Sequence, residues 1–266
     1  MRSFDYSGEE IRLSRLIAKT YPDLSYNRIQ KLLRERGVKV DGVRTSKDGL
    51  IRGSVHIEIY VAETDFNAVY EDDNIIIIDK PRGVPSTGKI SVESHFSKQG
   101  YFLCHRLDTN TRGLLVLAKN TKTEKLIEKS LRERNIEKYY RALVYGTLNG
   151  AEKLTAYAVK DSAGGYLKVY GEPVPGSVEI KTAYKVIGYE GDNTLLEVQL
   201  ITGRTHQIRA HLAFIGHFVL GDNKYGDEEI NKKLGFSKQQ LTADRIVFHF
   251  DKKSHLFYLD GKEIKL

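Results

Sequence analysis

Residues 104–120, CHRLDTNTRGLLVLAKN, place one acidic side chain where it could do chemistry. Asp108 lies at a turn that runs directly into the apolar segment 114–118. One interpretation is structural, because an Asp before Thr and Gly commonly accepts hydrogen bonds from backbone N–H groups two or three residues on. The other is chemical, because a carboxylate held by the strand behind it can act as a nucleophile or as an acid or base. For an isolated Asp in this setting the structural interpretation is the commoner one.

A second stretch, ITGRTHQIRAH, carries basic side chains that could hold such a carboxylate. Residues 204–217 predict a helix that begins near Thr205 and packs an apolar stripe on the core. His206 and Arg209 are three residues apart and can share a helix face. An Arg anchored in this way could pair with a partly buried carboxylate and keep it ionised and oriented. The alternative is a basic surface helix that only binds phosphate.

The third stretch, EKYYRALVYG, has two adjacent aromatic residues in a predicted strand at 138–146. Side chains alternate along a strand, so Tyr139 and Tyr140 must point to opposite faces. One of them therefore faces the core or a cleft. Packing alone would explain either residue, whereas the functional interpretation is an aromatic ring that stacks on a nucleic-acid base.

The composition limits the class of protein. The chain has 266 residues, 40% hydrophobic and 29% charged, and no apolar run approaches the ~20 residues of a membrane-spanning helix. Its start lacks the apolar core of a signal peptide, and Cys104 is its only cysteine, so we expect a cytoplasmic protein without disulfides and without membrane attachment. The His residues lack metal-ligand spacing. The net charge of +7 favours a polyanionic partner, and nucleic acid is the usual one.

Residues 1–62 predict a separate small module. A short amphipathic helix near residues 11–20 ends at Pro22, and Ser25 can cap a second helix with an apolar i, i+3, i+4 face. Asp41-Gly42 within residues 38–45 is a strong two-residue hairpin signal. The expected order is therefore helix, helix and hairpin, with a later strand at HIEIYV.

The same module is basic. Residues 1–60 contain 12 Lys and Arg against 8 Asp and Glu. Arg28, Lys31 and Arg34 fall largely off the apolar face of the second helix, and the positive charge continues onto the hairpin at Lys39 and Arg44. A solvated helix face is the ordinary explanation, but the single sign of the charge favours a surface that contacts phosphates.

Residues 63–266 predict a larger α+β domain with a mainly antiparallel sheet, because many strands are interspersed with few helices. The predicted strands are NIIIIDK, LLVLAKN, KYYRALVYG and NTLLEVQLIT, with further hairpins across 147–190. The predicted helices lie at TKTEKLIEKSLRERN and at 204–217.

Together these motifs resemble one family. HRLDTNTRGLLVLAKN, KYYRALVYG, DKPRGVP and TGRTHQIRAHLAFIGHFVLGDNKYG, in this order across residues 69–250, are similar to the RluA-type RNA pseudouridine synthases. The stretch LSRLIAKTYPDLSYNRIQKLLRERGVKVDGV resembles a small RNA-binding module found in a ribosomal small-subunit protein, which is a common attachment in this family. The resemblance implies the pseudouridine synthase fold, a mixed and mainly antiparallel sheet around a central cleft.

The resemblance also implies roles for individual residues. Asp108 would be the catalytic residue that isomerises a uridine within RNA, without metal or cofactor. Arg209 would pair with Asp108, and Tyr140 would pack over the flipped uracil and help to remove the proton at ring carbon five. Arg106 would help to extrude the base. The remaining residues expected to contact RNA are Lys80, Lys119, Arg204 and His206.

Other interpretations remain open from the sequence. The protein could be a non-catalytic RNA-binding or ribosome-assembly protein on the same scaffold, although the presence of both Asp108 and Arg209 argues against this. A glycosidase-like enzyme would need a second carboxylate roughly 5–10 Å away, and the motifs supply none. Ribosomal RNA is the favoured substrate and transfer RNA the alternative, and we expect a monomer. The family usually has Ser where this chain has Arg112, and the segment between Pro85 and Cys104 is short.

Overall fold

The structure, a computed structural model, describes residues 2–22, 24, 26–60, 66–161 and 165–266. The chain divides into two compact units, Met1–Asp65 and Phe66–Leu266, each with its own apolar core. The sequence placed the division at residue 62, and residues 61–65 lie outside the described part.

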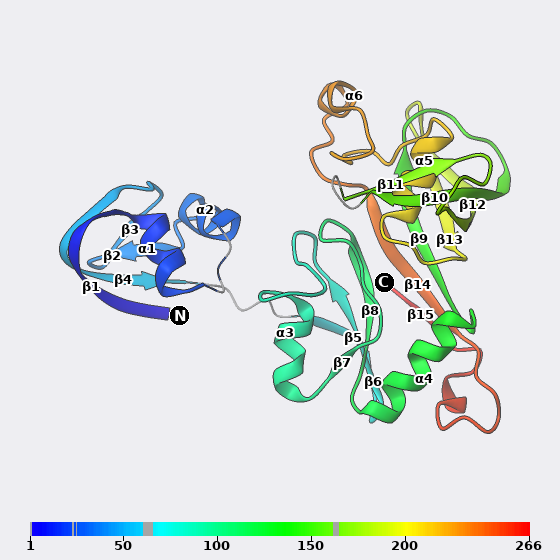
Figure 1. The fold of residues 1–266 in the computed structure, drawn as a ribbon, viewed down its shortest axis with the longest axis horizontal. Coiled ribbons are helices and arrows are strands. Elements are labelled where there is room, and N and C mark those ends of the chain that lie inside the picture. Colours follow the sequence, from blue (N-terminus) through cyan, green and yellow to red (C-terminus); the bar gives the residue numbers. More distant parts are fainter. Residues whose placement is uncertain (1, 23, 25, 61–65, 162–164) are drawn as a thin grey trace. The chain divides into compact units, whose positions relative to one another are not determined.

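The first unit packs two helices against a four-stranded antiparallel sheet of order β1-β4-β2-β3 (Figure 1). The strands are β1 (Arg2–Arg12), β2 (Val38–Val40), β3 (Val43–Thr45) and β4 (Leu50–Ile59), and the helices are α1 (Leu13–Thr20) and α2 (Tyr26–Arg34). Both predicted helices and the predicted hairpin are present. Asp41 and Gly42 have φ values of 48° and 79°, as a two-residue turn with left-handed backbone requires. The cap expected at Ser25 falls on a residue outside the described part.

The sequence interpretation missed β1, which precedes both helices. Its first residues alternate between partly buried and exposed, and Phe4 and Tyr6 pack on the core of the unit. The strand pairs with β4 along most of its length, with a bulge between Gly8 and Ile11. The irregular Ser-Gly-Glu-Glu stretch at that bulge obscures the period-two pattern by which a strand is recognised.

The second unit is built on an 11-stranded sheet with the order β11-β10-β12-β13-β9-β14-β8-β6-β5, in which β15 also pairs with β14 and β7 with β8. The strands are β5 (Asn67–Glu71), β6 (Ile75–Lys80), β7 (Phe102–Leu103), β8 (Arg112–Ala118), β9 (Ile136–Val144), β10 (Ala151–Asp161), β11 (Tyr166–Tyr170), β12 (Val178–Glu190), β13 (Asn193–Leu200), β14 (Leu241–Phe248) and β15 (Glu263–Lys265). The α-helices are α3 (Val92–Phe96), α4 (Thr121–Arg132), α5 (Gln207–Phe214) and α6 (Glu228–Lys233). The α+β class and the mainly antiparallel sheet are confirmed.

The strand β14, which the sequence interpretation also missed, lies between β9 and β8 (Figure 1). It runs antiparallel to β9 and parallel to β8, and Ala243 is paired with both Tyr140 and Gly113. Gly113 has a φ of 129°, and a Cβ built on it would lie 2.1 Å from the Ala243 carbonyl oxygen. Only glycine allows this approach. β14 therefore brings the start of β8, just after Asp108, beside the middle of β9.

Candidate active site

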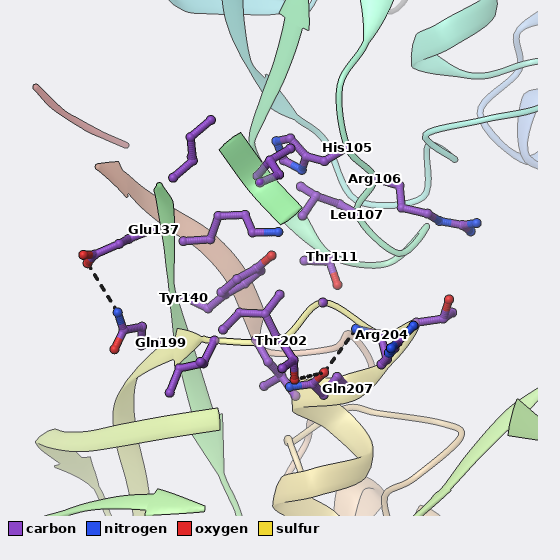
Figure 2. Close-up of a pocket in the computed structure, with 18 of the residues that line it drawn as sticks. His105, Arg106, Leu107, Thr111, Glu137, Tyr140, Gln199, Thr202, Arg204 and Gln207 are labelled. Atoms are coloured by element: carbon purple, nitrogen blue, oxygen red, sulfur yellow. Dashed lines mark hydrogen bonds between the residues drawn. The ribbon is translucent and has the colours of Figure 1, made fainter. Parts of the chain in front are cut away.

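A cavity of about 830 Å³ opens beside this junction. Its walls come from the segment 104–108 that leads into β8, from β9, and from residues 199–209, which comprise the end of β13, the loop after it and the start of α5. Figure 2 shows Tyr140 projecting from its strand into the space between the segment with Arg106 and Leu107 and the loop with Thr202 and Gln207. Three sequence motifs thus form one site.

The floor of the cavity holds an arginine between two carboxylates. Nη1 of Arg209 donates to Oδ2 of Asp108 at 2.8 Å, while Nε and Nη2 donate to the two carboxylate oxygens of Asp222 at 2.6 and 2.8 Å. The Arg209 side chain is 6% exposed, that of Asp222 is fully buried and that of Asp108 is 18% exposed. The expected contact between Arg209 and Asp108 is present, and of the two carboxylates Asp108 lines the cavity whereas Asp222 does not.

Arg209 and the two carboxylates stabilise one another in their charged forms. Burial alone would lower the pKa of Arg209, but hydrogen bonds and charges from Asp222 and Asp108 raise that pKa above its ordinary value. Burial would raise the pKa of Asp222, and the bonds and charge of Arg209, with the backbone N–H groups of Lys224 and Tyr225, lower it instead. The result is a rigid cation that positions the Asp108 carboxylate.

Hydrogen bonds to neighbouring residues hold the backbone of the segment that carries Asp108. Oγ of Ser86 donates to the carbonyl of Leu107 at 2.8 Å and accepts from its N–H at 2.9 Å. The N–H of Gly83 donates to the carbonyl of Thr109 at 2.8 Å. The Asp108 side chain accepts no backbone N–H within the described residues, so it does not form the turn that its local sequence suggested.

The position of Lys80 contradicts the role expected for it from the sequence. We expected it to contact phosphate, but the residue is fully buried and Nζ donates to the carbonyls of Pro81, Val84 and Thr109 at 2.8 to 3.2 Å. Burial lowers the pKa of Lys80 to about 8, although the charge of Asp108 opposes the shift. Lys80 therefore holds the backbone next to Asp108 and has no surface to offer to RNA.

A buried glutamine closes the loop before α5. Oε1 of Gln207 accepts from Oγ1 of Thr202 and from the N–H of Arg204, while Nε2 donates to the carbonyl of Lys181 and to Oγ1 of Thr182. Because this loop uses residues 202–206, the helix begins at Gln207 and not near Thr205 as expected. His206 has a left-handed φ of 59° and provides no side-chain cap.

The two adjacent tyrosines separate as predicted. Tyr140 lines the cavity and is 5% exposed. Burial and the nearby charge of Asp108 raise the pKa of Tyr140, so its hydroxyl is protonated at neutral pH. Tyr139 lies on the other face, where its hydroxyl donates to Glu137 and the guanidinium of Arg245 lies 3.6 Å from its ring centroid.

His206 also reaches the site. Its Nε2 lies 3.9 Å from Oδ2 of Asp108, and its Nδ1 is 3.2 Å from the hydroxyl of Tyr225. Burial and the cations Arg209 and Lys224 lower the pKa of His206, and Asp108 only partly opposes this. The imidazole is therefore neutral at pH 7 and can serve as a hydrogen-bonding group at the cavity wall.

The other predicted RNA contacts are distributed as follows. Arg106 and Arg204 are exposed and line the mouth of the cavity (Figure 2). Lys119 lies outside the cavity lining, where Nζ pairs with Glu71 at 2.7 Å and faces the ring of Tyr101. Arg112, the departure from the family pattern, forms an ion pair with Asp79 at 2.7 Å.

In the first unit, Lys31 and Arg34 are exposed on α2, and Lys31 makes a weak ion pair with Glu35 at 3.6 Å. The side chain of Arg28 lies outside the described part. On the hairpin, Lys39 pairs with Glu58 at 3.3 Å and Arg44 donates to the carbonyl of Arg36. These residues belong to the first unit and form no part of the cavity.

Sequence reasoning gave no role to Asp222, Gln207 or Lys138, which all belong to the motifs quoted for the resemblance. A charged residue within FVLGDNKYG, between apolar residues and a turn, was the available signal for Asp222. Among the described residues, no group of three or more His, Cys, Asp or Glu side chains could hold a metal ion. In the same described ranges, no helix has the length and apolar character needed to cross a membrane.

Comparisons with known proteins identify the family of this chain. Residues 74–214 match the family model of RNA pseudouridylate synthase. The chain is 34% identical over 256 residues to an RNA pseudouridine synthase of Aquifex aeolicus, an alignment that covers 84% of this chain and 79% of the relative. It is 30% identical to ribosomal large subunit pseudouridine synthase D of Vibrio cholerae, with 89% of this chain and 83% of that protein covered.

Solved structures show the same fold. Human RNA pseudouridylate synthase domain containing 4 superposes with a TM-score of 0.58 at 26% identity, covering 68% of this chain and 84% of that one. The sequence matches span the motifs that build the cavity. The chain therefore belongs to the RNA pseudouridylate synthase family and is an isomerase that converts uridine in RNA to pseudouridine.

Proposed function

We propose that this enzyme modifies uridines of large-subunit ribosomal RNA, with Asp108 as its catalytic residue. The observation that carries the assignment of Asp108 is its position at the cavity floor, where Arg209 and the buried Asp222 hold one of its oxygens. Oδ1 of Asp108 accepts no hydrogen bond from the described residues, which leaves it available for the substrate.

The reaction needs a base that can leave the sugar and return in a new orientation. The bond between the ribose anomeric carbon and ring nitrogen one breaks, the base turns, and a bond to ring carbon five forms. The Asp108 carboxylate can add to the anomeric carbon or to ring carbon six, or can act as a base in an elimination. In all three cases it must be ionised and aimed, and the contact with Arg209 supports both requirements.

The uridine must leave its helix to reach this position. Enzymes that act on a base extrude it into a pocket and stack it on apolar or aromatic side chains. Tyr140 offers such a ring inside the cavity, and Arg106 at the mouth can take the place that the base leaves.

Replacing Tyr140 with Phe is expected to slow the release of the carbon-five proton by about 10²–10⁴-fold, with RNA affinity unchanged. The ring is retained, so packing on the base is preserved. The hydroxyl is lost, and with it the polar group that we propose helps to remove this proton. Tritium release from RNA labelled with [5-³H]uridine measures the rate, and a Phe variant as fast as wild type would show that Tyr140 acts by packing alone.

The substrate class is supported by the relatives. The protein of Vibrio cholerae carries ribosomal large subunit in its name. We expect tritium release from labelled large-subunit ribosomal RNA and none from labelled transfer RNA of the same cells. Release from transfer RNA alone would overturn the choice of substrate while leaving the role of Asp108 intact.

We also propose that the first unit binds RNA through basic residues that include Arg28, Lys31 and Arg34. Deleting residues 1–65 is expected to weaken RNA affinity and to flatten its dependence on salt, because fewer phosphates are neutralised. The rate at saturating RNA should not change, since the cavity lies entirely in the second unit. Filter binding at several salt concentrations measures this, and an unchanged affinity would contradict the proposal.

We propose that the enzyme is a monomer. We propose that it acts in the cytoplasm, where its RNA substrate is found. Sedimentation of the active protein measures whether it is a monomer.

A further inference from the structure

Lys138 is a cation inside the catalytic cavity that the reaction described above does not use. It lies on β9 two residues before Tyr140, so the two side chains emerge on the same face, about 6.6 Å apart along the strand. Both residues line the cavity. Its Nζ reaches the opposite wall, where a Cβ built on Gly203 would lie 3.8 Å from it.

This ammonium has no partner among the residues that the structure describes. Within the described ranges, no hydrogen bond, ion pair or cation–π contact involves Lys138. Lys80 is the instructive contrast, because its buried ammonium donates to three carbonyls. Lys138 is half-buried and lines the cavity, and a cation largely removed from water is costly unless it is paired. The free ammonium therefore points to a negatively charged or strongly accepting group that arrives with the substrate.

The groups around Lys138 provide no compensating charge. His105, on the segment before Asp108, is neutral, because burial and the charge of Lys138 lower its pKa to about 3. Glu137 is engaged on the other face of β9 with Tyr139, and Asp108 is held by Arg209. Among the described residues, the rest of the cavity lining adds the cations Arg106, Arg132, Arg134, Lys153 and Arg204, against the carboxylate of Glu128 on α4. Burial is the one cause that lowers the pKa of Lys138, to about 8, so the ammonium stays protonated at neutral pH.

A uracil stacked on Tyr140 with its sugar at Asp108 would extend along β9 toward Lys138. When the bond from the anomeric carbon to ring nitrogen one breaks, its electron pair passes to the ring and is shared between that nitrogen and the ring oxygens. Addition of Asp108 to ring carbon six also places negative charge on a ring oxygen. No proton needs to move to Lys138 in either case.

We propose that the Lys138 ammonium stabilises the negative charge that forms on the uracil ring during this step, an inference that rests on the proposed role of Asp108. A cation fixed where charge develops is among the strongest contributions to catalysis. Lys138 is thereby assigned as a catalytic residue that contacts the base.

The test compares Lys138→Met and Lys138→Arg with wild type on RNA from cells that lack the protein, labelled with [5-³H]uridine. The Met variant is expected to release tritium about 10²–10³-fold more slowly at saturating enzyme, with RNA affinity within about twofold. Its melting temperature should be equal or higher, because a half-buried charge without a partner among the described residues is removed. Lys125→Met, which removes an exposed cation of α4 outside the cavity, is the matched control and should match wild type.

A pH profile separates the proposed role from a structural one. The wild-type rate should fall as pH rises above about 8, where the ammonium loses its proton, and the Arg variant should be slower but lack this fall. A full rate in the Met variant would overturn the proposal, as would a loss of RNA affinity alone, which would assign Lys138 to a phosphate contact. Asp108→Asn is measured in parallel: if it remains active, the proposed function has failed, whereas an inactive Asn variant beside an active Met variant confines the failure to Lys138.

Discussion

The Asp108→Asn variant is expected to lose on the order of 10⁴-fold in the rate of pseudouridine formation while it keeps its fold and its affinity for RNA. The amide can still accept a hydrogen bond from Arg209, so the local structure is preserved. It carries no negative charge and is neither a nucleophile nor a base. Tritium release under single-turnover conditions measures the rate, and filter binding measures the affinity.

A matched control is available on the surface. Asp73 is exposed, and its replacement with Asn makes the same chemical change away from the cavity. We expect that variant to be indistinguishable from wild type. An Asp108→Asn variant that kept more than a tenth of the wild-type rate would show that another group does the chemistry.

The Arg209→Met variant is expected to be both inactive and unstable. It leaves the fully buried Asp222 without its ion-pair partner, and breaking a buried pair in this way costs about 3–5 kcal/mol of unfolding free energy. It also removes the group that orients Asp108. Urea unfolding measures the first effect and tritium release the second.

The double variant Arg209→Met/Asp222→Leu separates the two effects. Removing both charges should recover much of the lost stability, because no buried carboxylate remains unpaired. Activity should stay lost, since Asp108 still has no partner. A double variant that regained activity would show that Arg209 acts only by stabilising the fold.

The dependence of stability on acid pH is an independent test of the Arg209–Asp222 ion pair. The pKa of Asp222 is lowered in the folded state, so the unfolded chain binds this proton first as the pH falls. The stability that Asp222 contributes is therefore complete at neutral pH and is lost below its ordinary value near 3.8. The double variant should lack this part of the acid dependence.

The three residues expected to do the chemistry could be found from the sequence because their motifs together resemble one family. Taken singly, the approach of Asp108 to an apolar strand, the alternation of Tyr139 and Tyr140 and the helix that carries Arg209 each had an ordinary structural explanation. The structure places these side chains in or beside one cavity, and it places Arg209 within hydrogen-bond distance of Asp108.

Other features of the fold and the site depend on contacts between residues distant in sequence, which no local sequence pattern predicts. The strand β14 joins two halves of the sheet through contacts that are distant in sequence, and its polar residues hide its period. Asp222 is functional only because the fold carries it behind Arg209. Lys80 resembles a phosphate ligand in sequence, and only the fold shows that its ammonium is enclosed by backbone carbonyls.

The most direct test maps pseudouridine in ribosomal and transfer RNA from cells that lack this protein and have received either the wild-type chain or Asp108→Asn. Chemical labelling followed by primer extension locates each modified position. We expect one or more positions in large-subunit ribosomal RNA to be modified with the wild-type chain and unmodified with the Asn variant. Restoration by both chains, or by neither although both bind RNA, would contradict the assignment of Asp108 as the catalytic residue of this isomerase.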